Sequence, residues 1–225
     1  MRLMGSGTIA PAHVAVAASL VLIPAVRPGV AAACPDAELQ PTQSNLARVE
    51  AAIVCLLNVD REALERAPVT RDLRLERSAV RHTGDMTRRG YFAHTRKDGP
   101  TVLERIRRAR YFAGARSGLY SENLGYGPPE RATAASMHRA FSLSTSHRKT
   151  MLHGRFRNIG IGSTMIDAHP AFYPDYPAVV FTLDFGRRYE HPRRLCRRRA
   201  ASAARTDPSG RALPPRRWCR RRSSR

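Results

Sequence analysis

The sequence predicts an α+β fold in which helices come first and strands last. Apolar residues recur at helical spacing in the first half of the central region, whereas its end holds two runs rich in β-branched and apolar residues. Proline and glycine mark short connections between these segments. Helices followed by strands, joined by short loops, are typical of layered α+β domains.

The first predicted helix runs from Ser44, as a candidate N-cap, to about Glu65, and Pro68 lies beyond its end. One apolar stripe at helical spacing supports it. The stripe consists of Leu46, Val49, Ile53, Leu56, Leu57 and Leu64.

The second predicted helix runs from Asp72, which can cap its first turn, to about Arg89. Gly90 follows at the position where a helix commonly ends in left-handed backbone. Pro100 is expected in the first turn of a short helix to Ala109. The later segments predict two more helices and then two strands, at residues 131–142, 146–152, 156–166 and 178–185.

The N-terminus has the pattern of an export signal over residues 1–33. An almost wholly apolar run from Val14 to Val26 follows the single early charge of Arg2, and the small residues 31–33 match a cleavage site. We therefore predict a secreted protein whose domain covers residues 34–186. Two alternatives are a buried N-terminal helix and attachment to the envelope through a lipidated Cys34.

The residues from Arg187 to Arg225 form an arginine-rich tail. Fifteen arginines against two acidic residues give it +13 of the total charge of +21. Such a charge block favours a solvated, disordered extension that is attracted to anionic cell-envelope polymers or lipid headgroups. Aromatic residues hardly interrupt it, so specific binding of nucleic acid is not expected.

Four cysteines in an exported chain permit disulfides, and four allow three pairings. The simplest prediction is local pairing, with Cys34 bound to Cys55 so that the N-terminal arm is held on the first helix. Cys196 and Cys219 lie in the tail.

Three residues could carry chemistry: His94, Glu122 and His147. His94 is expected in a loop after a helix, Glu122 in a glycine-containing loop, and His147 at the start of a short helix. Two imidazoles and a carboxylate can bind zinc or another divalent metal, or act as an acid/base set. The alternative is that each histidine caps a helix or satisfies a buried partner.

His82 and Asp85 stand three residues apart on the second predicted helix, so we expect them to hydrogen-bond each other and to support the site. The pair Ser144 and His147 has the spacing of a nucleophile and base, but no orienting acid is evident.

Several short motifs occur in a fixed order along residues 34–186. Together they resemble the CAP superfamily of cysteine-rich secretory proteins, venom antigens and plant pathogenesis-related proteins, in its SCP-like secreted bacterial branch. The matching segments are 55–58 with Arg61, 79–86, 90–95, 122–124, 144–148, 156–162 and 182–186.

The resemblance implies an α-β-α sandwich of the CAP/SCP type with a central cleft, in which some members bind a divalent metal. By motif match His94, Glu122 and His147 take the places of the cleft residues. The remaining motif residues near them, which we expect to support the site, are His82, Asp85, Asn123, Ser144 and Asp184. Ser144 stands where many animal and plant members have a second glutamate.

We therefore predict a secreted protein whose His/Glu cleft binds a small ligand or a divalent metal, acting at the cell envelope. One alternative is a metal-dependent, peptidase-like hydrolase that uses the same cleft. The other is a purely structural extracellular domain. No complete catalytic set is evident, which favours binding over catalysis.

Overall fold

The computed structural model describes residues 34–190. The predicted signal peptide and most of the arginine-rich tail, with Cys196 and Cys219, lie outside the described residues. Within residues 34–190, no helix is both long enough and apolar enough to span a bilayer.

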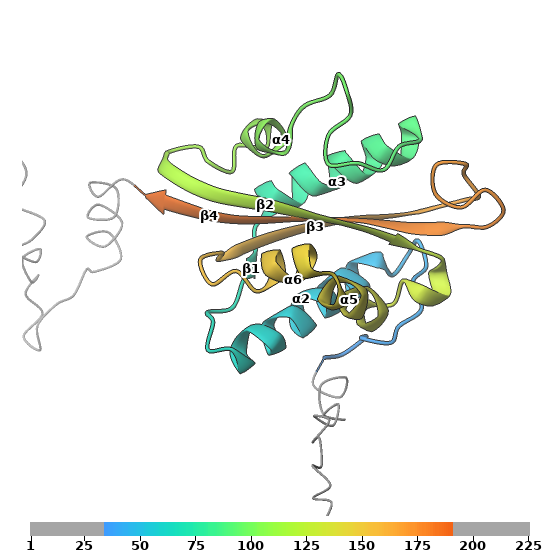
Figure 1. The fold of residues 1–225 in the computed structure, drawn as a ribbon, viewed down its shortest axis with the longest axis horizontal. Coiled ribbons are helices and arrows are strands. Elements are labelled where there is room, and N and C mark those ends of the chain that lie inside the picture. Colours follow the sequence, from blue (N-terminus) through green and yellow to red (C-terminus); the bar gives the residue numbers. More distant parts are fainter. Residues whose placement is uncertain (1–33, 191–225) are drawn as a thin grey trace, which may run out of the picture.

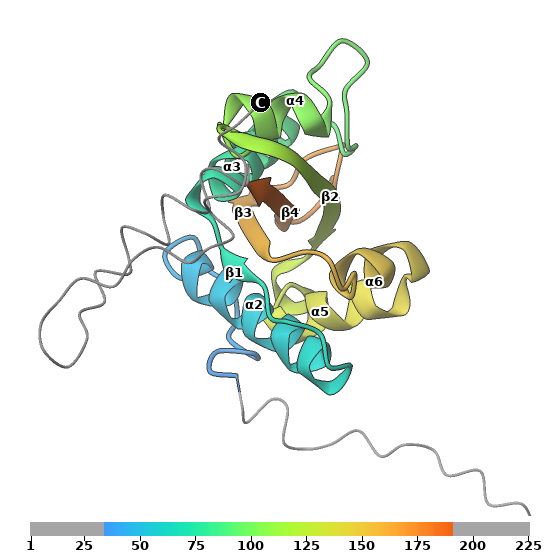
Figure 2. The ribbon, with the colours of Figure 1, turned by 90° about the vertical axis from the view of Figure 1, so that its left-hand side faces the viewer.

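A four-stranded sheet forms the middle layer, with strand order β1-β3-β4-β2. Strand β1 pairs with β3 in parallel, and the other neighbours are antiparallel. Helices α3 and α4 cover one face, and α2, α5 and α6 cover the other (Figures 1 and 2). The predicted α-β-α sandwich is therefore confirmed. Its elements are α2 Leu46–Ala63, β1 Thr70–Arg71, α3 Leu73–Arg89, α4 Val102–Arg108, β2 Ala115–Gly127, η1 Pro129–Arg131, α5 Ala134–Leu143, α6 Thr145–Met151, β3 Asn158–Ile166 and β4 Ala178–Glu190.

The ends of helix α3 follow the predicted signals. The Asp72 side chain accepts a hydrogen bond from the Arg74 N–H at the start, and Gly90 ends the helix with φ of 65°. Two other caps differ from the prediction. Asn45 rather than Ser44 precedes α2, and α4 starts after Thr101, whose capping box with Glu104 leaves Pro100 outside the helix.

Strand β2 corrects the prediction that Glu122 lies in a loop. Its glycines had indicated a loop, but they allow close packing within the sheet. A Cβ at Gly125 would lie 2.6 Å from Met137 and 2.8 Å from Phe141, and one at Gly118 would lie 2.2 Å from Phe112. Because these neighbours come from other elements, the sequence around Glu122 carries no sign of them.

Strand β4 continues four residues beyond the predicted domain boundary at Gly186. Arg187, Arg188, Tyr189 and Glu190 all pair with residues of β2. The charge of the arginines had marked this stretch as tail. Backbone hydrogen bonding does not depend on side-chain charge, so the sheet includes them.

Helix α3 packs closely on β3 because two positions of that strand have no side chain. A Cβ at Gly160 would lie 2.1 Å from the Glu76 nitrogen, and one at Gly162 would lie 2.3 Å from the Val80 nitrogen. Contact with backbone at such distances cannot be relieved by a side-chain rotation. The two glycines therefore set how near α3, and with it His82, comes to the sheet.

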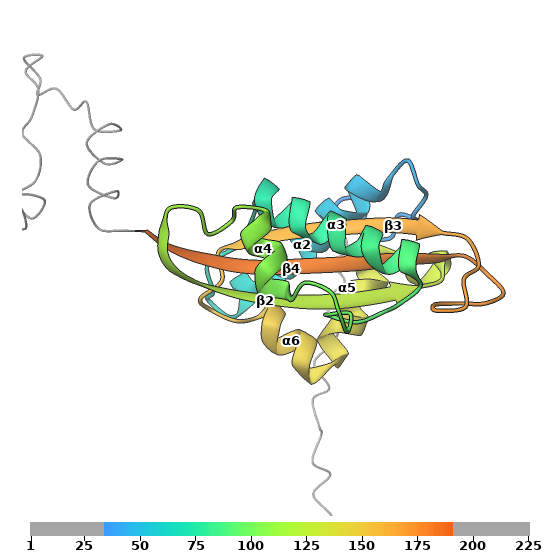
Figure 3. The ribbon, with the colours of Figure 1, turned by 90° about the horizontal axis from the view of Figure 1, so that it is seen from above.

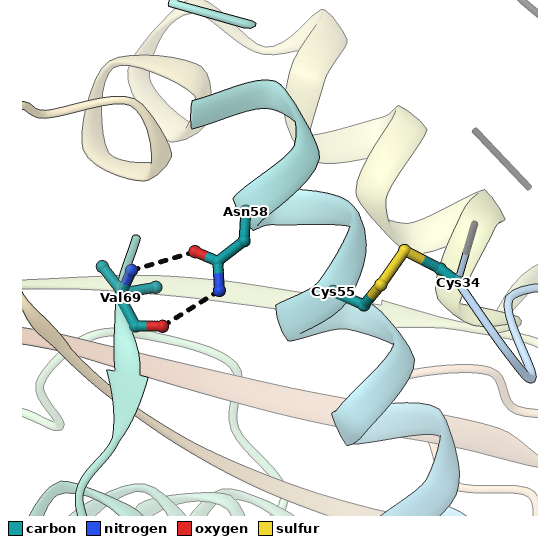
Figure 4. The surroundings of a disulfide bond; sticks show 4 residues. All are labelled: Cys34, Cys55, Asn58 and Val69. Atoms are coloured by element: carbon teal, nitrogen blue, oxygen red, sulfur yellow. Dashed lines mark hydrogen bonds between the residues drawn. A yellow bond between two sulfur atoms is a disulfide. The ribbon is translucent and has the colours of Figure 1, made fainter. Parts of the chain in front are cut away.

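The predicted disulfide between Cys34 and Cys55 is confirmed (Figure 4). It fastens the N-terminal arm to α2, one turn from Asn58, whose side-chain amide exchanges two hydrogen bonds with the backbone of Val69. A cysteine in this bond has no thiol for a lipid, which contradicts the alternative of a lipidated Cys34.

Replacing Cys34 and Cys55 together by serine should lower the free energy of unfolding by about 3 kcal/mol, because the bond closes a loop with a sequence separation of 21. Urea denaturation of the secreted wild-type and variant proteins measures this. Identical midpoints before and after reduction of the wild type would contradict the prediction.

Candidate functional site

Glu122 lies at the centre of the site, in the middle of β2. Its Cα pairs with that of Asp184 in the neighbouring strand β4. The Glu122 side chain is only 1% exposed, and Asp184 is wholly buried. Two adjacent strands thus bring two carboxyl groups together in the interior, a contact that required β2 to be a strand.

Both oxygens of Glu122 have partners. Its Oε1 is 2.8 Å from Nδ1 of His94, and its Oε2 accepts a hydrogen bond of 2.6 Å from Nη2 of Arg105. His82 also approaches, with its Nε2 3.8 Å from Oε1. Glu122 therefore joins α3, α4, the loop after α3 and the sheet.

Arg105 is a site residue that the sequence analysis missed. Its side chain is 8% exposed. Besides Glu122, its Nη1 donates to the carbonyl oxygens of His94 and Pro100, each at 2.9 Å. It thereby fixes the loop that carries His94. In the sequence it belongs to the basic run 105–108, of which Arg107 and Arg108 are exposed, so composition did not distinguish it.

The two carboxyl groups differ in charge. Burial opposes ionisation of Glu122, but the hydrogen bond with His94 and the charge of Arg105 outweigh it and hold the pKa of Glu122 below its ordinary value. Burial, reinforced by the charge of Glu122, raises the pKa of Asp184 well above its ordinary value. Glu122 is therefore the anion of the pair, and Asp184 favours its neutral form.

This difference predicts a pH-dependent stability. A raised pKa in the folded state stabilises the fold below the ordinary aspartate pKa, and that contribution is lost as pH rises through the raised value. The asparagine of Asp184→Asn stays neutral at every pH. As pH increases from 4 upward, the stability of this variant relative to the wild type should therefore increase. Urea denaturation across that range measures the difference. The exposed Asp167→Asn variant is the control. A difference in free energy of unfolding between Asp184→Asn and the wild type that stays constant with pH would contradict the prediction.

His82 lies beside Glu122 and makes no hydrogen bond to Asp85. Its Nε2 lies 3.1 Å from the Ala93 carbonyl oxygen, and burial lowers its pKa to about 4, so the ring is neutral at pH 7. Asp85 instead accepts hydrogen bonds from the Tyr91 hydroxyl and Arg89. The predicted His82–Asp85 bond is wrong because the His82 ring is buried against the sheet, whereas the Asp85 side chain lies nearer the surface.

His94 is open to solvent, with 55% of its side chain exposed. Its Nδ1 is engaged with Glu122, and within residues 34–190 its Nε2 makes no hydrogen bond to protein. A buried carboxylate that holds Nδ1 favours the proton there and leaves Nε2 as the acceptor. The exposed edge of His94 can therefore take a proton or coordinate an external group.

His147 lies at the start of α6, as predicted, and its ring is half-buried. It packs edge-on against Phe141, with ring centroids 5.2 Å apart, and Asn123 donates a 3.1 Å hydrogen bond to its carbonyl oxygen. Burial lowers the pKa of His147, and the charge of the nearby His94 adds to the effect. Asn123 therefore contacts the backbone of His147, and its supporting role stays a prediction. Ser144 contacts Ser146 instead of the three central residues.

A family sequence model matches more than half of the chain. It is described as the cysteine-rich secretory protein family, CAP, and covers residues 54–185. The chain belongs to the CAP family. A search of curated proteins finds no match to this CAP protein.

Two solved structures are similar to this CAP protein. One is an extracellular protein containing an SCP domain from Bacillus anthracis strain Ames, at 21% identity and a TM-score of 0.47, covering 63% of this chain and 43% of that one. The other is an outer surface protein from Borrelia burgdorferi, at 19% identity and a TM-score of 0.48, covering 66% and 96%. This CAP chain spans less than half the length of the Bacillus protein.

The predicted zinc site does not fit the present positions of its three residues. Both oxygens of Glu122 are occupied, and one of them faces the cationic Arg105. Within residues 34–190, no three His, Cys, Asp or Glu side chains are grouped so as to hold a metal ion. The imidazoles of His94 and His147 are the two side chains of this set that could still act as ligands of an external ion. Zinc binding therefore stays a prediction.

Proposed function

We propose that this chain is an exported CAP protein that uses His94, Glu122 and His147 to bind a small polar ligand or a divalent ion at the cell envelope. The supporting observation is the hydrogen bond of 2.8 Å between the buried Glu122 and Nδ1 of the exposed His94. It orients one imidazole edge toward solvent from a rigid strand. Such an edge with a buried support is typical of recognition sites.

The two imidazoles provide complementary chemistry. At neutral pH the lowered pKa of His147 leaves its ring uncharged, and His94 presents Nε2. Together they can accept two hydrogen bonds from a ligand or donate two lone pairs to an ion. Glu122 contributes through its two partners, because it neutralises Arg105 and holds Nδ1 of His94.

Calorimetric titration with zinc chloride at pH 7.5 tests the metal-binding form of this proposal. We expect His94→Ala and His147→Ala each to weaken zinc binding about tenfold or more, and His153→Ala, a half-buried histidine elsewhere, to leave it unchanged. Affinity should also fall in acid, because ligating imidazoles must be unprotonated. Absence of binding, or binding that survives both site variants, would restrict the proposal to organic ligands.

NMR spectra of the histidine side chains provide the corresponding test for organic ligands. Envelope fragments that bind at the site should shift the ring signals of His94 and His147 and leave those of His153 in place. If no fragment and no metal ion perturbs either ring, the cluster has a structural role only, and the proposal is wrong.

A second candidate is hydrolysis, which the contact between Glu122 and His94 specifically favours. A carboxylate on Nδ1 makes Nε2 a candidate general base toward water or a hydroxyl. Turnover of peptide or cell-wall substrates by the wild type, lost in His94→Ala but kept in His153→Ala, would establish it. Equal rates in both variants would attribute the turnover to a contaminant.

A further inference from the structure

One pocket is lined mainly by arginines. It has a volume of about 380 Å³, and its lining comes from α3, α4 and the loop that joins them. These two helices lie on the same face of the sheet (Figure 3). Helix α3 contributes one face, the loop contributes Tyr91, Arg96 and Pro100, and α4 contributes Arg105 and Arg108. The α3 residues are Ser78, Arg81, His82, Asp85, Arg88 and Arg89.

The charges of this pocket are not balanced by the protein. Six arginines line it, and Asp85 is its one acidic residue. Asp85 already binds Arg89, and Arg105 is paired with Glu122. The four other arginines make no ion pair with any carboxylate of residues 34–190; they are Arg81, Arg88, Arg96 and Arg108.

Two of the lining arginines also hold buried donors that nothing accepts. The Nε of Arg96 and the Nε of Arg105 are buried and, within residues 34–190, have no hydrogen-bond partner. A buried N–H on a cation without an acceptor costs about 1–3 kcal/mol or more. Like charges gathered around a small volume add repulsion. An anion with several acceptor oxygens in the pocket removes this repulsion, whereas the two Nε atoms are buried and lie beyond its direct reach.

We propose that this pocket is a binding site for a phosphate group. Guanidinium groups form forked pairs of hydrogen bonds with phosphate oxygens. Here they come from three directions, from α3, the loop and α4, which suits a tetrahedral anion better than a planar carboxylate. The volume lies within the range of about 300–1,000 Å³ that is usual for small-molecule sites, so the phosphate belongs to a larger compound or headgroup.

This site is separate from the proposed function. It uses Arg96 and the α3 arginines, whereas the ligand-binding edges of His94 and His147 do not line it. Arg105 and His82 are common to both, since each lines the pocket and approaches Glu122. Failure of zinc or ligand binding at His94 therefore leaves the phosphate proposal intact, and the reverse also holds.

Calorimetry with pyrophosphate, using the full mature chain at about 0.15 M salt, tests the proposal. The pocket variant is Arg88→Gln with Arg96→Gln, and the matched control is Arg116→Gln with Arg139→Gln. Both control arginines are exposed and lie outside the pocket. Each double variant removes two positive charges, so the arginine-rich tail and the net charge contribute equally in both.

We expect the pocket variant to bind pyrophosphate about tenfold or more weakly than the wild type, and the control to stay within about twofold. Thermal midpoints of both variants establish that they are folded. Equal loss in both variants would assign binding to overall charge, and no loss in the pocket variant, or no binding by the wild type, would also overturn the proposal.

Vesicle sedimentation separates the two sources of the phosphate group. Phosphatidylglycerol vesicles that bind the wild type, release it on addition of pyrophosphate and fail to bind the pocket variant identify a lipid headgroup. Pyrophosphate binding without vesicle binding identifies a soluble phosphorylated compound. Vesicle binding that pyrophosphate does not reduce, with equal binding by the pocket variant, would place membrane contact elsewhere and count against the headgroup.

Discussion

Replacing Arg61 with methionine should destabilise the domain by roughly 3–5 kcal/mol. Arg61 is completely buried on α2, and its guanidinium donates hydrogen bonds to four backbone carbonyl oxygens. Burial lowers its pKa to about 10, so it is charged at neutral pH. The acceptors are Ala67, Met151, His153 and Phe156.

The loss is large because one guanidinium ties together carbonyls from separate segments of the chain. They come from the connection after α2, the end of α6 and the approach to β3. The end of a helix also has partial negative charge, which favours the cation. Methionine fills a similar volume but offers no donor. The carbonyl oxygens of His153 and Phe156 keep the Phe156 N–H and Arg157, whereas those of Ala67 and Met151 lose the donor that Arg61 supplied.

Chemical denaturation of Arg61→Met, Arg61→Lys and Arg139→Met measures the effect. Lysine should recover part of the loss, because it keeps the charge but cannot reach all four acceptors in the geometry of the guanidinium. Arg139 is exposed on α5, so its replacement should change the free energy by less than about 0.5 kcal/mol. A loss below about 1 kcal/mol in Arg61→Met would mean that water replaces the guanidinium.

Replacing Glu122 with alanine should cost about 3–5 kcal/mol, since it leaves the charge of Arg105 buried without its carboxylate. It should also free the His94 ring and loosen the loop that Arg105 holds. Glu122→Gln keeps the shape and one acceptor oxygen, so we expect a smaller loss. The position next to Asp184 makes a further effect testable: without the Glu122 charge, the raised pKa of Asp184 should fall.

A double-mutant cycle with Arg105→Met isolates the pair. The double variant Glu122→Ala with Arg105→Met should be less unstable than the sum of the two single variants, by about 1 kcal/mol or more. Additive losses would mean that the two residues stabilise the fold independently. The cycle should be measured at pH 7, where Glu122 is ionised.

Local sequence signals were sufficient for the helical layers. The caps at Asp72 and Gly90, the apolar stripe of α2 and the apolar runs of β3 and β4 depend on residues close in the chain. The disulfide between Cys34 and Cys55 was also predictable, because a short separation makes local pairing the simplest choice. Motif order alone led to the CAP resemblance that the family comparison confirms.

The same signals selected candidate residues for the site, but not the contacts that these residues make. His94, Glu122 and His147 were singled out as a set of metal ligands. In the structure Glu122 is buried, its carboxylate is taken by His94 and Arg105, and the open positions are imidazole edges. The sequence identifies the carboxylate. Whether its oxygens are free to bind a metal depends on which neighbouring side chains already hydrogen-bond to them.

The sequence by itself thus determined the family, the order of the helices, both ends of α3, and the disulfide. Tertiary structure decided that the glycine-containing segment around Glu122 is strand β2, that Asp184 is its neutral partner, and that Arg105 and Arg61 are buried cations. The physical reason is shared by all four. Strand pairing and the burial of a charge are settled by groups distant in the chain, so the local pattern around each residue contains no trace of its partner.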